Sequence, residues 1–104
     1  MKTIILLSIS ILIAAPLSAR AADAKTNWDN NCAQCHGKDG RADTKIGKTV
    51  SAKNLTDPKV QAAFTDAAAT QTIKVGMKAM PAFGGKLSDD EIKALVAYVR
   101  SLKK

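Results

Sequence analysis

The 104-residue sequence has few of the side chains from which many protein sites are built. It contains one histidine, two cysteines, one tryptophan, one tyrosine and two phenylalanines. A structural zinc site uses four cysteine or histidine ligands, so the three present here do not suffice. No stretch shows the apolar-polar alternation of a strand, and the βαβ pattern that accompanies dithiol redox motifs is missing. These absences exclude a zinc module and argue against a thioredoxin-like domain.

Acidic residues are also scarce, with 9 Asp and Glu against 16 Lys and Arg, for a net charge of +7. Such an excess of positive charge is common in nucleic-acid-binding proteins, but here the lysines are dispersed. No basic run with interleaved aromatic residues occurs, so we expect no nucleic-acid partner. The charge instead favours solubility and electrostatic steering toward an acidic protein partner.

Long hydrophobic runs are missing, and the apolar stretch at residues 4–15 is too short to span a bilayer comfortably. Lys2 precedes this stretch and Pro16 ends it. The small residues that follow offer two candidate cleavage points, after Ala19 and after Ala21. This arrangement is typical of a secretory signal peptide, with an uncleaved membrane anchor as the alternative.

We therefore predict a signal peptide over residues 1–21 and a single mature domain over residues 22–104. Loss of Lys2 and Arg20 with the signal would reduce the net charge from +7 to +5. We expect the mature protein in the periplasm, with no stable membrane insertion after cleavage. A compartment like the thylakoid lumen fits less well.

Both cysteines and the histidine lie in one pentapeptide, Cys-Ala-Gln-Cys-His at residues 32–36. This is the spacing that attaches a c-type haem. Cys32 and Cys35 can each add to a vinyl group of the porphyrin, and His36 can then offer the proximal nitrogen ligand to the iron. A structural disulfide would leave His36 without a role. The motif predicts one covalently attached haem c, with a haem-free dithiol protein as the alternative.

Hydrophobic periodicity predicts an all-α domain. We expect a first helix over residues 24–35 and a loop over residues 37–47, where glycines and charges replace apolar residues. A short helix should end near residue 64, and a further helix capped by Asp66 should run to residue 75 and stop at Gly76.

The last helix has the clearest sequence signal. Ser88 and Glu91 form a capping box ahead of apolar residues at helical spacing. Tyr98 should pack on the first helix, where Trp28 is expected in the core. Four apolar residues are available to line a haem pocket: Leu55, Val60, Phe64 and Ile73.

Two methionines lie three residues apart in an irregular segment before the last helix. A methionine there could fill a gap in the core or bind the iron as the sixth ligand. Met80 is the better candidate, because Pro81 stiffens the backbone beside its sulfur, and Met77 is the alternative.

With these motifs, the chain resembles a small exported monohaem cytochrome c of class I, closest to the short bacterial and algal electron carriers. The resemblance covers essentially all of the mature chain and rests on residues 31–37, 80–83 and 87–99. It implies three to five helices around one covalently attached haem, with the terminal helices crossing near a right angle. It also implies axial ligation by His36 and Met80.

The chain departs from this family at two points. The family usually has a glycine where the terminal helices touch, and this chain has Ala24. The family also often has a proline whose carbonyl accepts the proximal imidazole proton, yet no proline lies between His36 and Asp57. The sequence therefore leaves open which carbonyl orients His36.

Ligation by His36 and Met80 would leave no open position for a substrate, which favours a one-electron carrier over an enzyme. We expect a monomer that docks weakly on a redox donor and an acceptor, at least one of them acidic. The alternative is a haem protein in which Met80 does not bind, such as a gas sensor or a small haem enzyme.

Overall fold

The computed structural model describes residues 8–11 and 18–104 of the chain. Within these residues the structure is helical and has no strand, and an isolated β-bridge joins Met77 and Met80. The prediction of an all-α domain is confirmed. The helices are α1 (Ser18–Asn31), α2 (Ala33–His36), α3 (Lys45–Thr49), α4 (Pro58–Ala62), α5 (Asp66–Val75) and α6 (Asp89–Ser101).

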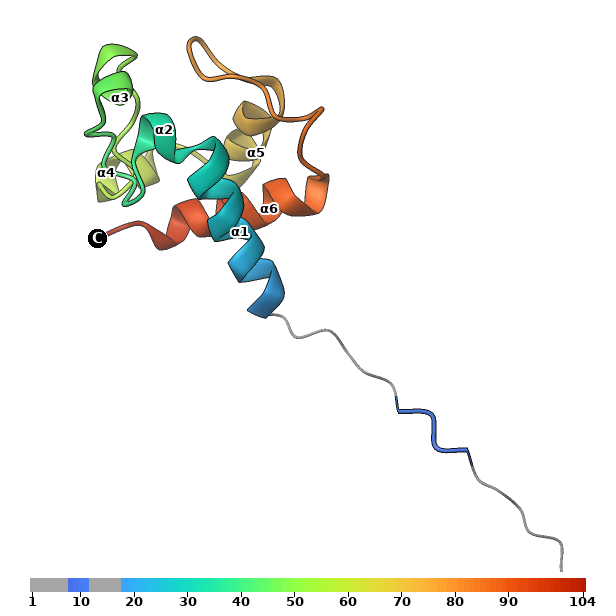
Figure 1. Cartoon of the computed structure of the whole chain (residues 1–104). Coiled ribbons are helices and arrows are strands. Elements are labelled where there is room, and N and C mark those ends of the chain that lie inside the picture. Colours follow the sequence, from blue (N-terminus) through green and yellow to red (C-terminus); the bar gives the residue numbers. More distant parts are fainter. Residues whose placement is uncertain (1–7, 12–17) are drawn as a thin grey trace, which may run out of the picture.

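The two longest helices, α1 and α6, lie across one another and form the base on which the other elements pack (Figure 1). Helix α5 also packs on α6, and α2 contacts both α1 and α3. The largest fully buried side chains are Trp28 from α1 and Ile92 and Leu95 from α6. The core therefore lies where the terminal helices meet.

Helix α6 begins as its sequence predicted. The Ser88 hydroxyl accepts the Glu91 amide proton at 3.1 Å, and the Glu91 carboxylate accepts that of Ser88 at 3.0 Å. These two bonds satisfy amides that have no partner within the helix. Asn27 donates to the other Glu91 carboxylate oxygen at 3.0 Å, so the cap also ties α6 to α1. The apolar face then buries Ile92, Leu95, Val96 and Val99.

The first helix differs from its prediction over residues 24–35. Helix α1 starts earlier, at Ser18, and ends at Asn31, while α2 carries the haem-attachment motif separately. The break falls at Cys32, where φ is −113°. Part of the predicted signal peptide, residues 1–7 and 12–17, lies outside the described residues.

Two further boundaries differ because a threonine caps a helix. Thr44 caps α3 by accepting the Gly47 amide proton, and this places a helix at the end of the predicted loop. Thr65, rather than Asp66, caps α5 by accepting the Ala68 amide proton. Gly76 ends α5 with φ 79°, as predicted. No helix in the described ranges has both the length and the apolar character needed to cross a membrane.

Candidate haem-binding site

The haem-attachment motif follows directly after α1 and forms one further helical turn. The Cys32 amide donates to the Trp28 carbonyl at 2.9 Å, and the His36 amide donates to the Cys32 carbonyl at 2.9 Å. These bonds keep Cys32, Cys35 and His36 on a single turn. Both cysteines are free thiols and partly buried. The two thiols and the imidazole are therefore presented together, as the spacing predicted.

A cavity of about 610 Å³ opens beside this turn. Its volume is within the range of small-molecule and cofactor pockets, and its walls are mainly apolar. The four apolar residues predicted to line a haem pocket all face it: Leu55, Val60, Phe64 and Ile73. Cys32, His36, Met77 and Met80 also line it, whereas Cys35 is not among its lining residues. The sequence thus identified the apolar and ligand-bearing residues at the centre of the prediction, but not other lining residues such as Lys59, Ala69 and Thr72.

His36 is oriented by a backbone carbonyl. Its Nδ1 lies 3.1 Å from the Lys53 carbonyl oxygen. Because a carbonyl can only accept, Nδ1 carries the proton and Nε2 keeps its lone pair for a metal. Burial lowers the pKa of His36, and the bond to Lys53 opposes part of this effect. The imidazole is therefore held in its neutral, metal-binding form.

The loop that carries Lys53 is fixed by backbone hydrogen bonds on both sides. The Ala52 amide donates to the Gly47 carbonyl at 2.9 Å, and the Leu55 amide donates to the Gly40 carbonyl at 2.8 Å. The Lys53 carbonyl thus takes the place that the family resemblance assigned to a proline carbonyl. Nothing in the side chain of Lys53 signals this role.

Helix α3 is pressed against the backbone of the motif. The Thr44 hydroxyl donates to the Cys35 carbonyl at 2.8 Å and accepts the Gly47 amide proton at 2.9 Å. A Cβ atom on Gly47 would overlap the Cys35 carbonyl oxygen. Gly47 therefore has to be glycine because of close approach rather than backbone conformation. We call residues 32–55, from the motif through this loop, the proximal segment.

The Trp28 side chain packs against the His36 ring. This side chain is 1% exposed, and its indole nitrogen donates to the Gly37 carbonyl at 3.1 Å. The indole lies 5.8 Å from the His36 ring and 5.5 Å from the Tyr98 ring, measured between centroids. The predictions that Trp28 is core and that Tyr98 packs on the first helix are confirmed.

The cysteine in the cavity is in an apolar environment. Burial raises the pKa of the Cys32 thiol to about 11. In the chain without haem, this thiol therefore stays protonated at neutral pH. It is a neutral sulfur held next to the space that the porphyrin requires.

The methionine loop, residues 77–80, forms another part of the cavity wall, because Met77 and Met80 both line the cavity. Met77 and Met80 exchange backbone hydrogen bonds of 3.1 Å and 2.9 Å, which bring the two residues opposite one another. Lys78, between them, has φ 53°, a left-handed conformation that is costly for a residue with a side chain. Met77 is 58% exposed, while Met80 is half-buried against the core. Met80 is therefore the more buried of the two methionines.

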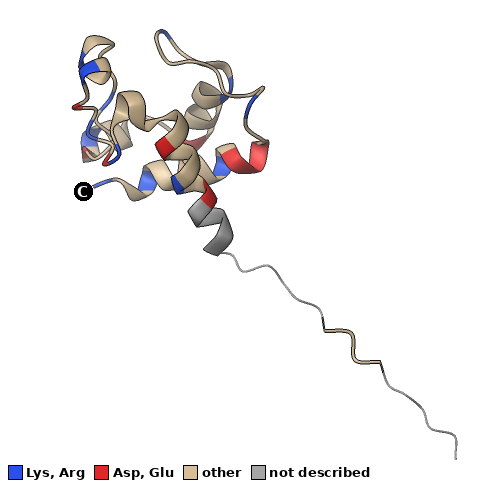
Figure 2. Ribbon diagram, in the orientation of Figure 1, with Lys and Arg blue, Asp and Glu red and all other residues tan. Residues whose placement is uncertain are grey.

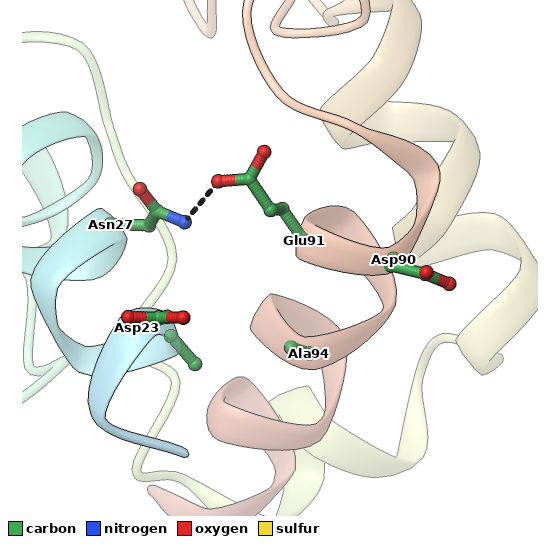
Figure 3. Close-up of a pocket in the computed structure, with 6 residues that line it drawn as sticks. Asp23, Asn27, Asp90, Glu91 and Ala94 are labelled. Atoms are coloured by element: carbon green, nitrogen blue, oxygen red, sulfur yellow. Dashed lines mark hydrogen bonds between the residues drawn. The ribbon is translucent and has the colours of Figure 1, made fainter. Parts of the chain in front are cut away.

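A second, smaller cavity of about 180 Å³ lies between α1 and α6 (Figure 3). Ala24 and Ala94 line it, together with Asn27 and carboxylates that include Glu91. Ala24 is 3% exposed, so the position at which the family usually has glycine is buried at the helix crossing. Small side chains on both helices leave room for the Ala24 methyl. None of the predicted haem-binding residues reaches this cavity.

The larger cavity fits a haem c in its apolar lining and its donor chemistry. One apolar space is bordered by the Cys32 thiol, an imidazole with a free Nε2 and the Met80 thioether. Apolar walls suit the porphyrin faces, while imidazole and thioether are donors that haem iron accepts.

Comparison with known proteins agrees with this reading. The sequence family described as cytochrome c oxidase, cbb3-type, subunit III matches residues 19–99. Cytochrome c6 of Tetradesmus obliquus is 38% identical over 82 residues, which cover 79% of this chain and 90% of that protein. A solved c-type cytochrome, KustC0563, superposes with a TM-score of 0.74 at 35% identity and covers 79% of this chain and 99% of its own.

The oxidase relatives are longer proteins. The cbb3-type oxidase subunit CcoP of Azospirillum brasilense is 36% identical over 86 residues, and the FixP subunit of Azorhizobium caulinodans is 42% identical over 73 residues. These matches cover 82% and 69% of this chain but only 29% and 24% of the two subunits. The likeness to these subunits is therefore to one part of each.

The matches to cytochrome c6 and to the solved c-type cytochrome cover nearly the whole of each relative. They set aside the haem-free dithiol alternative, because a c-type cytochrome carries covalently bound haem. The chain belongs to the small monohaem class I cytochromes c, and it is an electron-transport protein with one covalently attached haem c.

Proposed function

We propose that this chain is an exported, periplasmic one-electron carrier that holds its haem through Cys32 and Cys35 and ligates the iron with His36 and Met80. One observation carries the proposal: a single apolar cavity is bordered by the Cys32 thiol, the imidazole of His36 and the half-buried thioether of Met80. When bound, haem supplies reversible one-electron chemistry at its iron.

The residues of the chain suit a carrier rather than an enzyme. The Lys53 carbonyl fixes the tautomer of His36, and Met80 would occupy the position that a substrate needs. Apolar walls exclude water from the cofactor and need little rearrangement when its charge changes by one electron. A thioether ligand paired with a histidine also favours a relatively high reduction potential.

The test of this closed site is binding of carbon monoxide to the reduced holoprotein, made in a host with haem-attachment machinery. We expect negligible binding by the wild type and ready binding by Met80→Ala. The matched control, Met77→Ala, should behave as the wild type. Ready binding by the wild type would support the open-site alternative, a gas sensor or small haem enzyme, and contradict the carrier.

The charge distribution favours an acidic redox partner. Lys53 and Lys59 line the haem cavity, and Lys78 is exposed on the methionine loop. Basic residues are visible on α3 and on the loop after α5, whereas acidic residues gather at the start of α6 (Figure 2). Electron transfer requires a donor and an acceptor, and docking through scattered lysines would be weak and fast. We propose that the carrier is a monomer.

Ionic strength tests this docking model. The second-order rate of electron exchange with an acidic redox protein should fall several-fold between low and physiological salt, because exposed charges are screened. A basic redox protein of similar potential is the control, and its rate should rise or stay unchanged. A flat salt dependence with the acidic protein would contradict steering by lysines.

Export is proposed from the signal peptide over residues 1–21. The predicted cleavage points after Ala19 and Ala21 fall near the start of α1, which begins at Ser18. Cleavage there would shorten α1 without reaching Ala24, which is buried at the helix crossing. The intact mass of the haem-loaded protein from a periplasmic extract should correspond to residues 22–104 plus one haem.

A further inference from the structure

Arg100, near the end of α6, donates to four acceptor groups on three residues of the α4–α5 corner. Its Nε donates to Asp66 at 2.7 Å, and its Nη2 donates to the Phe64 carbonyl at 2.8 Å. Its Nη1 donates to the backbone carbonyl of Gln61 at 2.6 Å and to the Gln61 side-chain oxygen at 2.9 Å. All three guanidinium nitrogens are therefore engaged by one short stretch of chain.

Gln61 continues this network into the core. Its side chain is buried, and its amide nitrogen donates to the Leu55 carbonyl at 2.7 Å and to the Val99 carbonyl at 2.8 Å. Val99 belongs to α6, and Leu55 ends the proximal segment. The side chains of both residues line the haem cavity. Arg100 and Gln61 thus connect α6, α4 and the proximal segment around the cavity.

The corner that Arg100 holds is one wall of the haem cavity. Lys59, Val60, Ala63 and Phe64 all line it, whereas Arg100 does not. The Arg100 guanidinium lies 4.3 Å from the centre of the Phe64 ring, so it both binds the backbone and covers one face of the ring. The ring is thereby held between a cation and the haem space.

We infer that Arg100 is a positioning residue. It fixes the α4–α5 wall, and Phe64 in particular, against the haem. This packing excludes water from the cofactor and keeps its reduction potential high. The inference rests on the proposed function, since it requires haem in this cavity. A looser wall would admit water, which stabilises the more highly charged oxidised state and lowers the potential.

The geometry of the arginine, and not only its charge, is required. Asp66 already pairs with the guanidinium at 2.7 Å and neutralises much of its field. A lysine at this position would keep the charge, but it could not place three nitrogens on Asp66, Gln61 and Phe64 together. Arg100→Lys therefore separates the effect of positioning from that of charge.

The experiment measures the reduction potential of the haem-loaded protein and the hydrogen exchange of its amides at residues 59–66. In Arg100→Lys, we expect the one-electron equilibrium to shift toward the oxidised form by about three- to tenfold and exchange to rise in this segment. Lys103→Gln, which removes an exposed charge from the same end of the chain, is the matched control and should change neither.

If Arg100→Lys yields too little holoprotein, Phe64→Leu provides a second test. Phe64→Leu should lower the potential by itself, and combining the two changes should give less than the sum of their effects. An unchanged potential in either single variant, or strictly additive effects in the double variant, would overturn the inference. Failure of the proposed function would instead appear in the wild type, as ready binding of carbon monoxide.

Discussion

The proximal segment and the methionine loop face the same cavity but are held in different ways. On the proximal segment, the His36 imidazole is hydrogen-bonded to the Lys53 carbonyl, and the Cys35 carbonyl is hydrogen-bonded to the Thr44 hydroxyl. On the methionine loop, the two methionines are joined to each other by backbone bonds, and Met77 is largely exposed. The contrast indicates that the histidine is positioned in advance, whereas the sulfur is held by a short and strained turn.

This difference matters for how the cofactor is held and tuned. In the proposed site, a fixed imidazole would give the iron a constant partner, because the tautomer and direction of His36 are set by the fold. A ligand on an exposed turn is easier to displace. We therefore expect changes in the proximal segment to affect formation of the holoprotein, and changes in the methionine loop to affect the properties of a holoprotein that still forms.

The largest effect is expected for His36→Ala. The chain has no other histidine, so no other imidazole can take the ligand role proposed for His36. The yield of covalently haem-loaded protein should fall by an order of magnitude or more relative to wild type, as measured by haem staining of denatured protein. Met80→Ala, from the opposite wall, should still give coloured protein. A normal yield from His36→Ala would remove the distinction between the two regions.

Gly47→Ala should be the most damaging change that touches no haem-binding side chain. The added methyl would overlap the Cys35 carbonyl oxygen, so α3 must move away from the motif. We expect a loss of about 2–3 kcal/mol in the free energy of unfolding of the holoprotein. Gly85→Ala is the control, because nothing lies within 4 Å of its new methyl. Equal stabilities of the two variants in denaturant would contradict the close packing.

Met80→Ala should leave the fold largely intact but change the redox properties. Loss of the thioether should shift the one-electron equilibrium toward the oxidised form by about tenfold or more, which corresponds to about 59 mV. Voltammetry on the purified protein measures this shift. Met77→Ala should stay close to wild type, since Met77 is the more exposed of the two residues. A larger shift in Met77→Ala than in Met80→Ala would indicate that Met77 is the ligand.

Lys78→Gly tests the strain in the methionine loop. Glycine adopts the φ of 53° found at this position without steric cost, although it also increases the freedom of the unfolded chain. We expect a net gain of about 0.5–1 kcal/mol in the free energy of unfolding. A loss of stability would show that the turn is not strained.

Glu91→Gln changes a residue outside the haem cavity and should have the smallest effect on the free energy of unfolding. Hydrogen bonds from the Ser88 amide, the Asn27 side chain and the Ser88 hydroxyl lower the pKa of Glu91 from its ordinary value of 4.5. A lowered pKa in the folded state means that the carboxylate stabilises the protein above pH 4.5, and that this is lost as the pH falls through the folded-state value. The variant should be slightly less stable than wild type at neutral pH and equal to it in acid. A difference that persists in acid would assign the effect to packing.

Sequence reasoning worked where a side chain or a local pattern carries the information. The haem-attachment motif, the capping box at Ser88 and the apolar positions such as Phe64 follow from residue type and spacing. The carbonyl that orients His36 could not be found in this way, because every residue has a carbonyl and the choice of Lys53 depends on how a loop is folded. The contacts of Arg100 join residues 34–39 positions apart, which no local pattern can reveal.

The boundaries that were wrong have a similar origin. Helix α3 is short, and it forms at the end of a glycine-rich stretch because Thr44 caps it and Gly47 lets it approach the motif. Its stability comes from the tertiary contact with the Cys35 backbone rather than from its own sequence. Thr65 precedes Asp66 by one residue, and either side chain can cap a helix.

The most direct test of the account is the absorption spectrum of the oxidised, haem-loaded wild type beside that of Met80→Ala and Met77→Ala. We predict a weak sulfur-to-iron band toward the red in the wild type and in Met77→Ala, and its loss in Met80→Ala. A band that survives in Met80→Ala, or no such band in the wild type, would contradict the assignment of His36 and Met80 as the two ligands.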